Sequence, residues 1–147
     1  MRAAAAGFTL LELLIVVFIV SVLAMFAVPA YYDYATRARL AEGIYQIGPL
    51  KQAVAETYIL SGAWPTSNAD AGLPDASAYA SSVLEGISVA DDPAPGAIVI
   101  RYDEAKVPEV RGTNTLIFIP SQGGRTILWT CTAGTLPNNL RPAECRS

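Results

Sequence analysis

The feature that most constrains this chain is an apolar run over residues 8–30, in which Glu12 is the one charged residue. As an α-helix rising about 1.5 Å per residue, such a run is about 34 Å long, enough to cross a hydrocarbon core of about 30 Å. Inside lipid the backbone has to satisfy its own hydrogen bonds, and a single apolar segment does so as a helix. The run therefore predicts a membrane-spanning helix near the N-terminus.

Glu12 is unexpected in this run, because a carboxylate costs up to about 3 kcal/mol near the middle of a bilayer. Two interpretations are open. Either the side chain lies near the membrane surface and reaches the lipid headgroups, or it meets a cation from another chain. An ionisable residue inside a membrane segment marks a functional site by default, which favours the second interpretation.

The residues at the start of the run carry a family resemblance. Residues 7–12 read Gly-Phe-Thr-Leu-Leu-Glu, and this motif resembles the processing site of type IV prepilins. The resemblance implies that a membrane enzyme, the prepilin peptidase, cuts between Gly7 and Phe8 and methylates the new amino group of Phe8. It also places Glu12 at the position of the family's acid, the fifth residue of the mature chain.

A secretory signal peptide and a plain membrane anchor are the alternatives at the N-terminus. A signal peptide carries small residues after its apolar core, whereas the small residues here, from Ala3 to Gly7, precede it. A plain anchor leaves Glu12 unexplained. We therefore interpret residues 1–7 as a leader peptide.

The composition argues against catalysis and metal binding. The chain has 147 residues, long enough for one domain besides the helix, and no histidine, which excludes imidazole mechanisms and most transition-metal sites. We expect no enzyme activity, cofactor, metal or small-molecule substrate. The acid pairs Asp91-Asp92 and Asp103-Glu104 are interpreted as solvated turn positions rather than calcium ligands. Loss of residues 1–7 removes Arg2 and changes the net charge from −3 to −4, so the whole molecule does not attract nucleic acid.

Beyond the apolar run, the pattern predicts that the helix continues as an amphipathic half over residues 31–61. Tyrosines at the start of this half suit a membrane edge, and Ser61-Gly62 is a typical helix end. Pro29 and Pro49 are expected to bend the helix, as in the family, and the alternative is two helices with a turn at Gly48-Pro49. The predicted buried stripe comprises residues 40, 44, 47, 51, 54 and 58.

Residues 62–147 are predicted to form a β-domain. A connection over residues 62–85, pinned by Trp64 and Tyr79, precedes four short β-branched or aromatic runs bounded by turn residues. The predicted fold class is α+β: a long N-terminal helix, membrane-spanning in its first half, packed on a four-stranded antiparallel sheet, as in the pilin fold. The predicted strands cover residues 86–89, 97–102, 115–119 and 127–131.

Two cysteines, Cys131 and Cys145, occur near the C-terminus. Because the resemblance implies export from the cytoplasm, an even pair predicts a disulfide that ties the C-terminal tail to the last strand. Closing a loop of about 15 residues is worth roughly 3 kcal/mol in the chain-entropy model.

The resemblance implies a structural function. The chain is identified as resembling a major pilin of the type IVa class, which polymerises into a type IV pilus for adhesion and twitching motility, with DNA uptake as a further use. It implies residence in the bacterial inner membrane before assembly and in the extracellular pilus afterwards. Its partners would be other copies of the chain in a helical filament, the prepilin peptidase, the pilus assembly machinery, and a host surface or DNA. In the filament, Glu12 is predicted to pair with the α-amino group of Phe8 on a neighbouring subunit.

Three other functions are kept as alternatives: a minor pilin, a pseudopilin of type II secretion, and a DNA-binding receptor pilin. The first two share the N-terminal motif. The third needs a basic surface, for which the arginines at one end of the domain are the candidates; scattered surface charge is the favoured interpretation of these arginines. These arginines are Arg111, Arg125, Arg141 and Arg146.

Ser147 is noted as a candidate glycan site.

Overall fold

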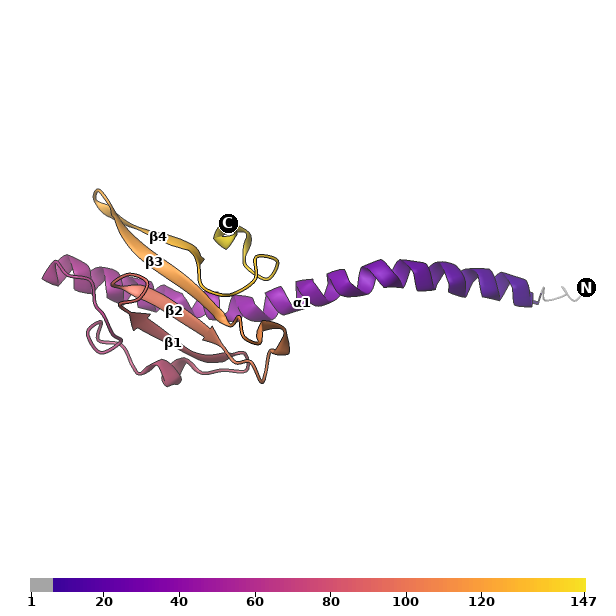
Figure 1. Ribbon diagram of the computed structural model, residues 1–147, viewed down its shortest axis with the longest axis horizontal. Coiled ribbons are helices and arrows are strands. Elements are labelled where there is room, and N and C mark those ends of the chain that lie inside the picture. The colour runs from indigo at the N-terminus through magenta and orange to yellow at the C-terminus, as the bar shows by residue number, and fades with distance from the viewer. Residues whose placement is uncertain (1–6) are drawn as a thin grey trace, which may run out of the picture. The chain divides into compact units, whose positions relative to one another are not determined.

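The computed structural model describes residues 7–147, so the predicted leader lies outside the described residues except for Gly7. One helix, α1 (Leu10–Ser61), runs for 52 residues (Figure 1). It passes through both prolines without interruption, so the alternative of two helices with a turn at Gly48-Pro49 is wrong. The predicted bends at Pro29 and Pro49 stay predictions.

The C-terminal end of α1 lies where the sequence predicts it. Gly62 has a φ of +75°, in the left-handed region that glycine adopts without a Cβ penalty. Its N–H donates to the carbonyl oxygen of Tyr58 at 2.9 Å, which satisfies one of the last carbonyls of the helix. A glycine directly after Ser61 therefore ends the helix by a local mechanism.

The chain divides into two compact units, Met1–Tyr34 and Ala35–Ser147. In the first unit, the described residues are the N-terminal part of α1 and the three residues before it, and all of them are exposed. The second unit holds the remainder of α1 and all of the β-structure. Each unit is described by itself below.

A four-stranded antiparallel sheet in the order β1-β2-β3-β4 forms the second unit's β-structure, which confirms the predicted fold class (Figure 1). Its strand β2 has the predicted bounds. The other three are longer than predicted: β3 and β4 extend into small or polar residues such as Ser121 and Gln122, which carry no apolar signal, and β1 begins two residues earlier, at the buried Leu84. The strands are β1 (Leu84–Ala90), β2 (Ala97–Tyr102), β3 (Thr115–Gly123) and β4 (Thr126–Ala133).

One face of α1 packs on this sheet within the second unit. Leu40, Ile47 and Val54 of the predicted stripe are buried, and Ile44 is half-buried. The sequence analysis missed Gly43 and Leu50, which complete a stripe at three- and four-residue spacing. Opposite them, the core of the sheet includes Leu84, Ile87, Ile98, Ile100, Tyr102, Leu116 and Phe118.

Lys51 interrupts the predicted stripe, and the structure explains how it is accommodated. Its ammonium nitrogen lies 4.3 Å from the ring centre of Phe118 and 5.4 Å from that of Trp129, within reach of cation–π attraction. Burial lowers the pKa of Lys51, and the negative charge of Glu144 opposes that shift. The faces of Phe118 and Trp129 thus accommodate the charge of Lys51 at a position where the stripe is otherwise apolar.

Gly43 sets how closely α1 approaches the sheet. A Cβ at this position would lie 3.0 Å from side-chain carbons of Leu84 and Ile100 and 3.3 Å from the hydroxyl of Tyr102. We expect Gly43→Leu to lower the free energy of unfolding by about 1–3 kcal/mol, because the extra carbons overpack the core. Thermal denaturation followed by circular dichroism measures this. Gly48→Leu is the matched control, since a Cβ at Gly48 meets no atom within 4 Å; equal losses for both variants would contradict the packing account.

The connection over residues 62–85 is ordered against the domain. Trp64 stacks on Tyr58 with ring centres 3.9 Å apart, and both Trp64 and Tyr79 pack on the core, as predicted. The sequence analysis missed Asn68. Its buried side chain donates to the carbonyl oxygens of Pro74 and Ile87 and accepts from the N–H of Val89, so it joins the connection to β1.

Candidate assembly site

The N-terminal motif forms the first turn of α1. The hydroxyl oxygen of Thr9 accepts a hydrogen bond from the N–H of Glu12 at 3.2 Å, and the carbonyl oxygen of Thr9 accepts one from Leu13 at 3.2 Å. Thr9 is therefore the N-cap residue, and Glu12 is the third residue of the helix. The sequence analysis missed Thr9, although Thr-x-x-Glu before an apolar run is the capping-box pattern.

The position of Glu12 leaves its carboxylate available to another chain. A negative charge in the first turn of a helix is favoured by the helix dipole, so the position itself is suitable for an acid. Within residues 7–147 no cation forms an ion pair with Glu12. An acid with no ion-pair partner among the described residues, on an apolar helix, matches the predicted pairing with a second chain. That pairing stays a prediction.

The apolar side chains from Leu13 to Ala30 are all exposed. Phe8 is 78% exposed and Phe26 is 72% exposed, and every residue between them is exposed in the described part of the chain. By length and composition, α1 is the one helix of the described residues suited to crossing a membrane. A surface of this kind needs lipid or further apolar helices around it.

Gly7 has no structural reason to be glycine. A Cβ at this position meets no atom within 4 Å, and its backbone does not lie in the left-handed region. Any requirement for glycine at this position therefore comes from outside the fold. The structure allows larger residues at Gly7 without strain.

Two family models match this chain, one over its N-terminal segment and one over most of the rest of the chain. The prokaryotic N-terminal methylation motif matches residues 2–28, which include the capped helix start. The model of the pilins, which are bacterial filament proteins, matches residues 36–146. The chain belongs to the pilin family. This pilin is accordingly a structural subunit of a bacterial filament.

Its relatives are named pilins or fimbrial proteins. The type IV major pilin protein PilE of Neisseria gonorrhoeae is 34% identical over 126 residues, which cover 85% of this pilin and 72% of the relative. The fimbrial protein EcpC of Eikenella corrodens is 32% identical over 141 residues, 96% of this pilin and 90% of the relative. The type IV major fimbrial protein FimA of Dichelobacter nodosus is 38% identical over 95 residues, covering 62% and 59%.

The predicted disulfide of this pilin is confirmed. Cys131 on β4 is bonded to Cys145, with Cα atoms 4.7 Å apart, and both residues are buried. The tail is thereby tied to the last strand, as predicted. A short 3-10 helix, Ala143–Cys145, brings Cys145 to the strand.

The acid pairs have local roles in turns. The carboxylate of Asp103 accepts from the N–H of Ala105 at 2.9 Å and forms an ion pair with Lys106 at 3.0 Å. The hydrogen bond from Lys106 lowers the pKa of Asp103 below its ordinary value. Glu104 accepts from the N–H of Gly112 at 3.1 Å. Asp91 and Asp92 are exposed in the turn between β1 and β2.

Of the four arginines grouped as a candidate DNA-binding surface, three are exposed and Arg141 is buried. Arg141 is 6% exposed and donates its hydrogen bonds to backbone carbonyls of the segment between the two cysteines, residues 132–144, called the C-terminal loop below. Arg146 donates to the carbonyl oxygen of Arg141. The grouping is therefore wrong for Arg141, because its charge is used inside the fold rather than on the surface.

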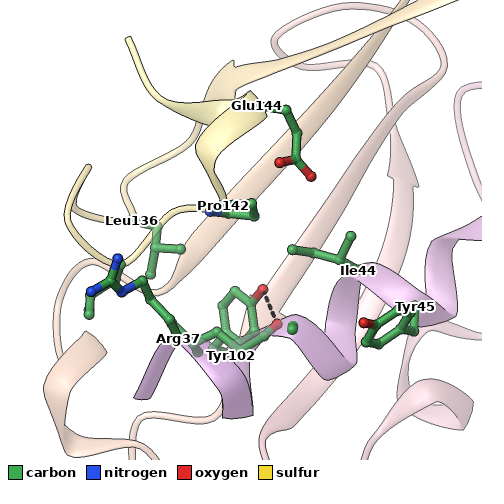
Figure 2. Close-up of a pocket in the computed structure, with 10 residues that line it drawn as sticks. Arg37, Ile44, Tyr45, Tyr102, Leu136, Pro142 and Glu144 are labelled. Atoms are coloured by element: carbon green, nitrogen blue, oxygen red, sulfur yellow. Dashed lines mark hydrogen bonds between the residues drawn. The ribbon is translucent and has the colours of Figure 1, made fainter. Parts of the chain in front are cut away.

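A pocket of about 250 Å³ lies between α1 and the C-terminal tail in the second unit (Figure 2). Leu136 and Pro142 of the tail line it from one side, and Ile44 and Tyr45 of α1 line it from the other. At its base, the hydroxyl of Tyr102 donates to the carbonyl oxygen of Leu40 at 2.9 Å, the dashed line in Figure 2. Burial raises the pKa of Tyr102 well above its ordinary value.

We expect Tyr102→Phe to lower the free energy of unfolding by about 1 kcal/mol at neutral pH, since one buried hydrogen bond is lost. The deficit should shrink as the pH rises through about 10, the ordinary tyrosine pKa. Above that pH the unfolded wild-type chain releases the phenol proton while the native one holds it, so the wild type loses stability. Thermal denaturation at pH 7 and pH 11 measures this, with the exposed Tyr45→Phe as control. A deficit that does not change with pH would contradict the assignment.

Proposed function

We propose that this pilin is the major subunit of a type IV pilus. It is made with a leader over residues 1–7, cut between Gly7 and Phe8, and methylated on the amino group of Phe8. Residues 8–30 then form the membrane-spanning and filament-core half of the helix, residues 31–61 the amphipathic half, and residues 62–147 the outer β-domain. The observation that carries the proposal is the coincidence of the methylation motif with a capped helix start and a fully exposed apolar surface.

Glu12 would determine how subunits align along the filament. The α-amino group of a cut chain is largely protonated at neutral pH, and methylation keeps its positive charge. In a filament core of low dielectric constant, an unpaired carboxylate is costly, whereas a carboxylate paired with an ammonium group is tolerated. The pairing of Glu12 with the amino group of Phe8 on a neighbour would therefore favour one register over others.

The names of the relatives support a major pilin over a minor pilin or a type II secretion pseudopilin, since two of them are called major subunits. Before assembly the subunit would reside in the inner membrane, where the prepilin peptidase and the assembly machinery would act on it. After assembly it would be part of the extracellular pilus. Adhesion to a host surface, twitching motility and DNA uptake would be activities of the filament. We propose no catalytic activity for the chain itself.

Intact mass and N-terminal sequencing of protein sheared from the cell surface test this proposal. We expect an abundant chain that begins with methylated Phe8 and carries one disulfide. A chain that still begins with Met1 and occurs only in the membrane fraction would overturn the proposal and indicate a plain anchor. A correctly cut chain in trace amounts within the fibres would favour the minor pilin instead.

A further inference from the structure

The C-terminal loop contains a buried cation. Arg141 is 6% exposed, and its guanidinium group donates three hydrogen bonds to backbone carbonyl oxygens. Nε donates to Leu136 at 2.6 Å, Nη2 donates to Gly134 at 2.8 Å, and Nη1 donates to Thr132. All three acceptors lie between the two cysteines along the chain: Thr132 is at the end of β4, and Gly134 and Leu136 follow it. A single side chain therefore connects the first part of this loop to its last part.

The loop is shaped around this guanidinium group. A buried charge is tolerated only when its hydrogen-bonding groups are satisfied, and a planar guanidinium can hold several carbonyls at fixed directions. The acceptors are alternate residues, so the backbone curves around the side chain. Gly134 permits the curve, with a φ of +101°, and a Cβ at this position would lie 2.5 Å from the carbonyl oxygen of Thr115.

Backbone hydrogen bonds also hold the loop in place, and they do not depend on the disulfide. The N–H of Leu136 donates to the carbonyl oxygen of Thr115 at 2.9 Å, which joins the loop to β3. The N–H of Leu140 donates to Pro137 at 3.0 Å, just before Arg141. Only three residues separate Arg141 from Cys145 along the chain, and Cys145 is fully buried. A loop fixed by these bonds places Cys145 beside β4.

We propose that Arg141 folds the C-terminal loop before the disulfide forms, and so positions Cys145 to react with Cys131 of the same chain. Arg141 is a positioning residue in this proposal and does not take part in the redox step. The proposal does not depend on filament formation.

The covalent step needs a disulfide-containing oxidant. The thiolate of one cysteine attacks the oxidant and releases one thiol, leaving a mixed disulfide. The thiolate of the other cysteine then attacks the mixed disulfide, forms the Cys131–Cys145 bond and releases the second thiol. Two protons and two electrons leave the protein, and the oxidant is reduced to two thiols. Arg141 would act by keeping the two cysteines of one chain close together during the second attack.

The first experiment follows this closure in the full chain, reduced in detergent micelles and then given oxidised glutathione. Alkylation of the remaining thiols and mass spectrometry give the rate of closure. We expect Arg141→Lys to close about tenfold more slowly and to accumulate disulfide-linked dimers, because a lysine cannot hold three carbonyls in one plane. Arg125→Lys is the control, since Arg125 is exposed in the turn between β3 and β4. Equal closure rates for both variants would overturn the proposal.

The second experiment separates the proposal from a general folding defect. Hydrogen exchange is measured in the double variant Cys131→Ser/Cys145→Ser, which keeps Arg141. We expect the amides of Leu136 and Leu140 to stay protected in it, and to lose at least tenfold in protection when Arg141→Lys is added. Loss of protection in the double variant alone would mean that the disulfide orders the loop, and the proposal would fall.

Discussion

Glu12→Gln is expected to leave a chain that inserts in the membrane and loses its leader but does not assemble. The substitution keeps the shape of the side chain and removes its charge, so the amino group of Phe8 on a neighbour would be left unpaired in the filament core. Breaking a buried ion pair costs about 3–5 kcal/mol, which corresponds to a loss of more than about 100-fold in subunit association. Quantitative immunoblots of the sheared and membrane fractions measure the result.

The matched control for this prediction is Glu56→Gln. Glu56 is also a carboxylate on α1, is exposed, and lies in the amphipathic half of the helix. We expect it to keep the wild-type yield of filaments. Wild-type yield from Glu12→Gln would refute the role of Glu12, and equal losses from both variants would point to a general effect of charge.

Gly7→Arg is expected to abolish leader removal and leave the fold unchanged. A side chain at this position has free space and no backbone strain, so the requirement for glycine comes from the peptidase rather than from the chain. We expect the uncut chain to accumulate in the membrane. Processing should fall below about a tenth of the wild-type level, the effect of losing a required interaction with the peptidase worth about 1.4 kcal/mol or more. The mass of the membrane-bound chain shows whether residues 1–7 remain.

Ala5→Arg serves as the control because it adds the same charge to the leader away from the cut. We expect it to be processed. A normally processed Gly7→Arg chain would place the cut elsewhere. Failure of both variants would show that added charge, rather than the loss of glycine, blocks the reaction.

Much of this fold follows from local signals in the sequence. The apolar run, the glycine after Ser61 and the four β-branched runs are each readable from a continuous stretch of sequence, so the long helix, its C-terminal end and the places of the four strands were predictable. Thr9 was also predictable from its capping-box pattern and was missed. The end of β3 was not, because Ser121 and Gln122 continue the backbone pairing with Leu128 and Ile127 of β4 without an apolar or β-branched signal of their own.

The remaining features depend on tertiary contacts that carry no sequence pattern. Gly43 is buried because Leu84 and Ile100 lie against it, and hydropathy does not identify such a glycine. Arg141 was placed on the surface because arginine is seldom buried. Its acceptors are backbone carbonyls, which every residue has, so composition and spacing do not reveal them. Lys51 was noted as an exception in the stripe, and only the positions of Phe118 and Trp129 account for it.

The most direct test of the account is zero-length cross-linking of sheared filaments with a carbodiimide, which joins a carboxylate to an adjacent amine. Trypsin releases residues 8–37 as one peptide, because Arg37 is the first basic residue after Phe8. The account predicts two copies of this peptide joined with loss of one water, and fragmentation that places the link between Glu12 and the amino group of Phe8. A link confined to one copy of the peptide, or a link at Asp33 instead of Glu12, would contradict the pairing between subunits.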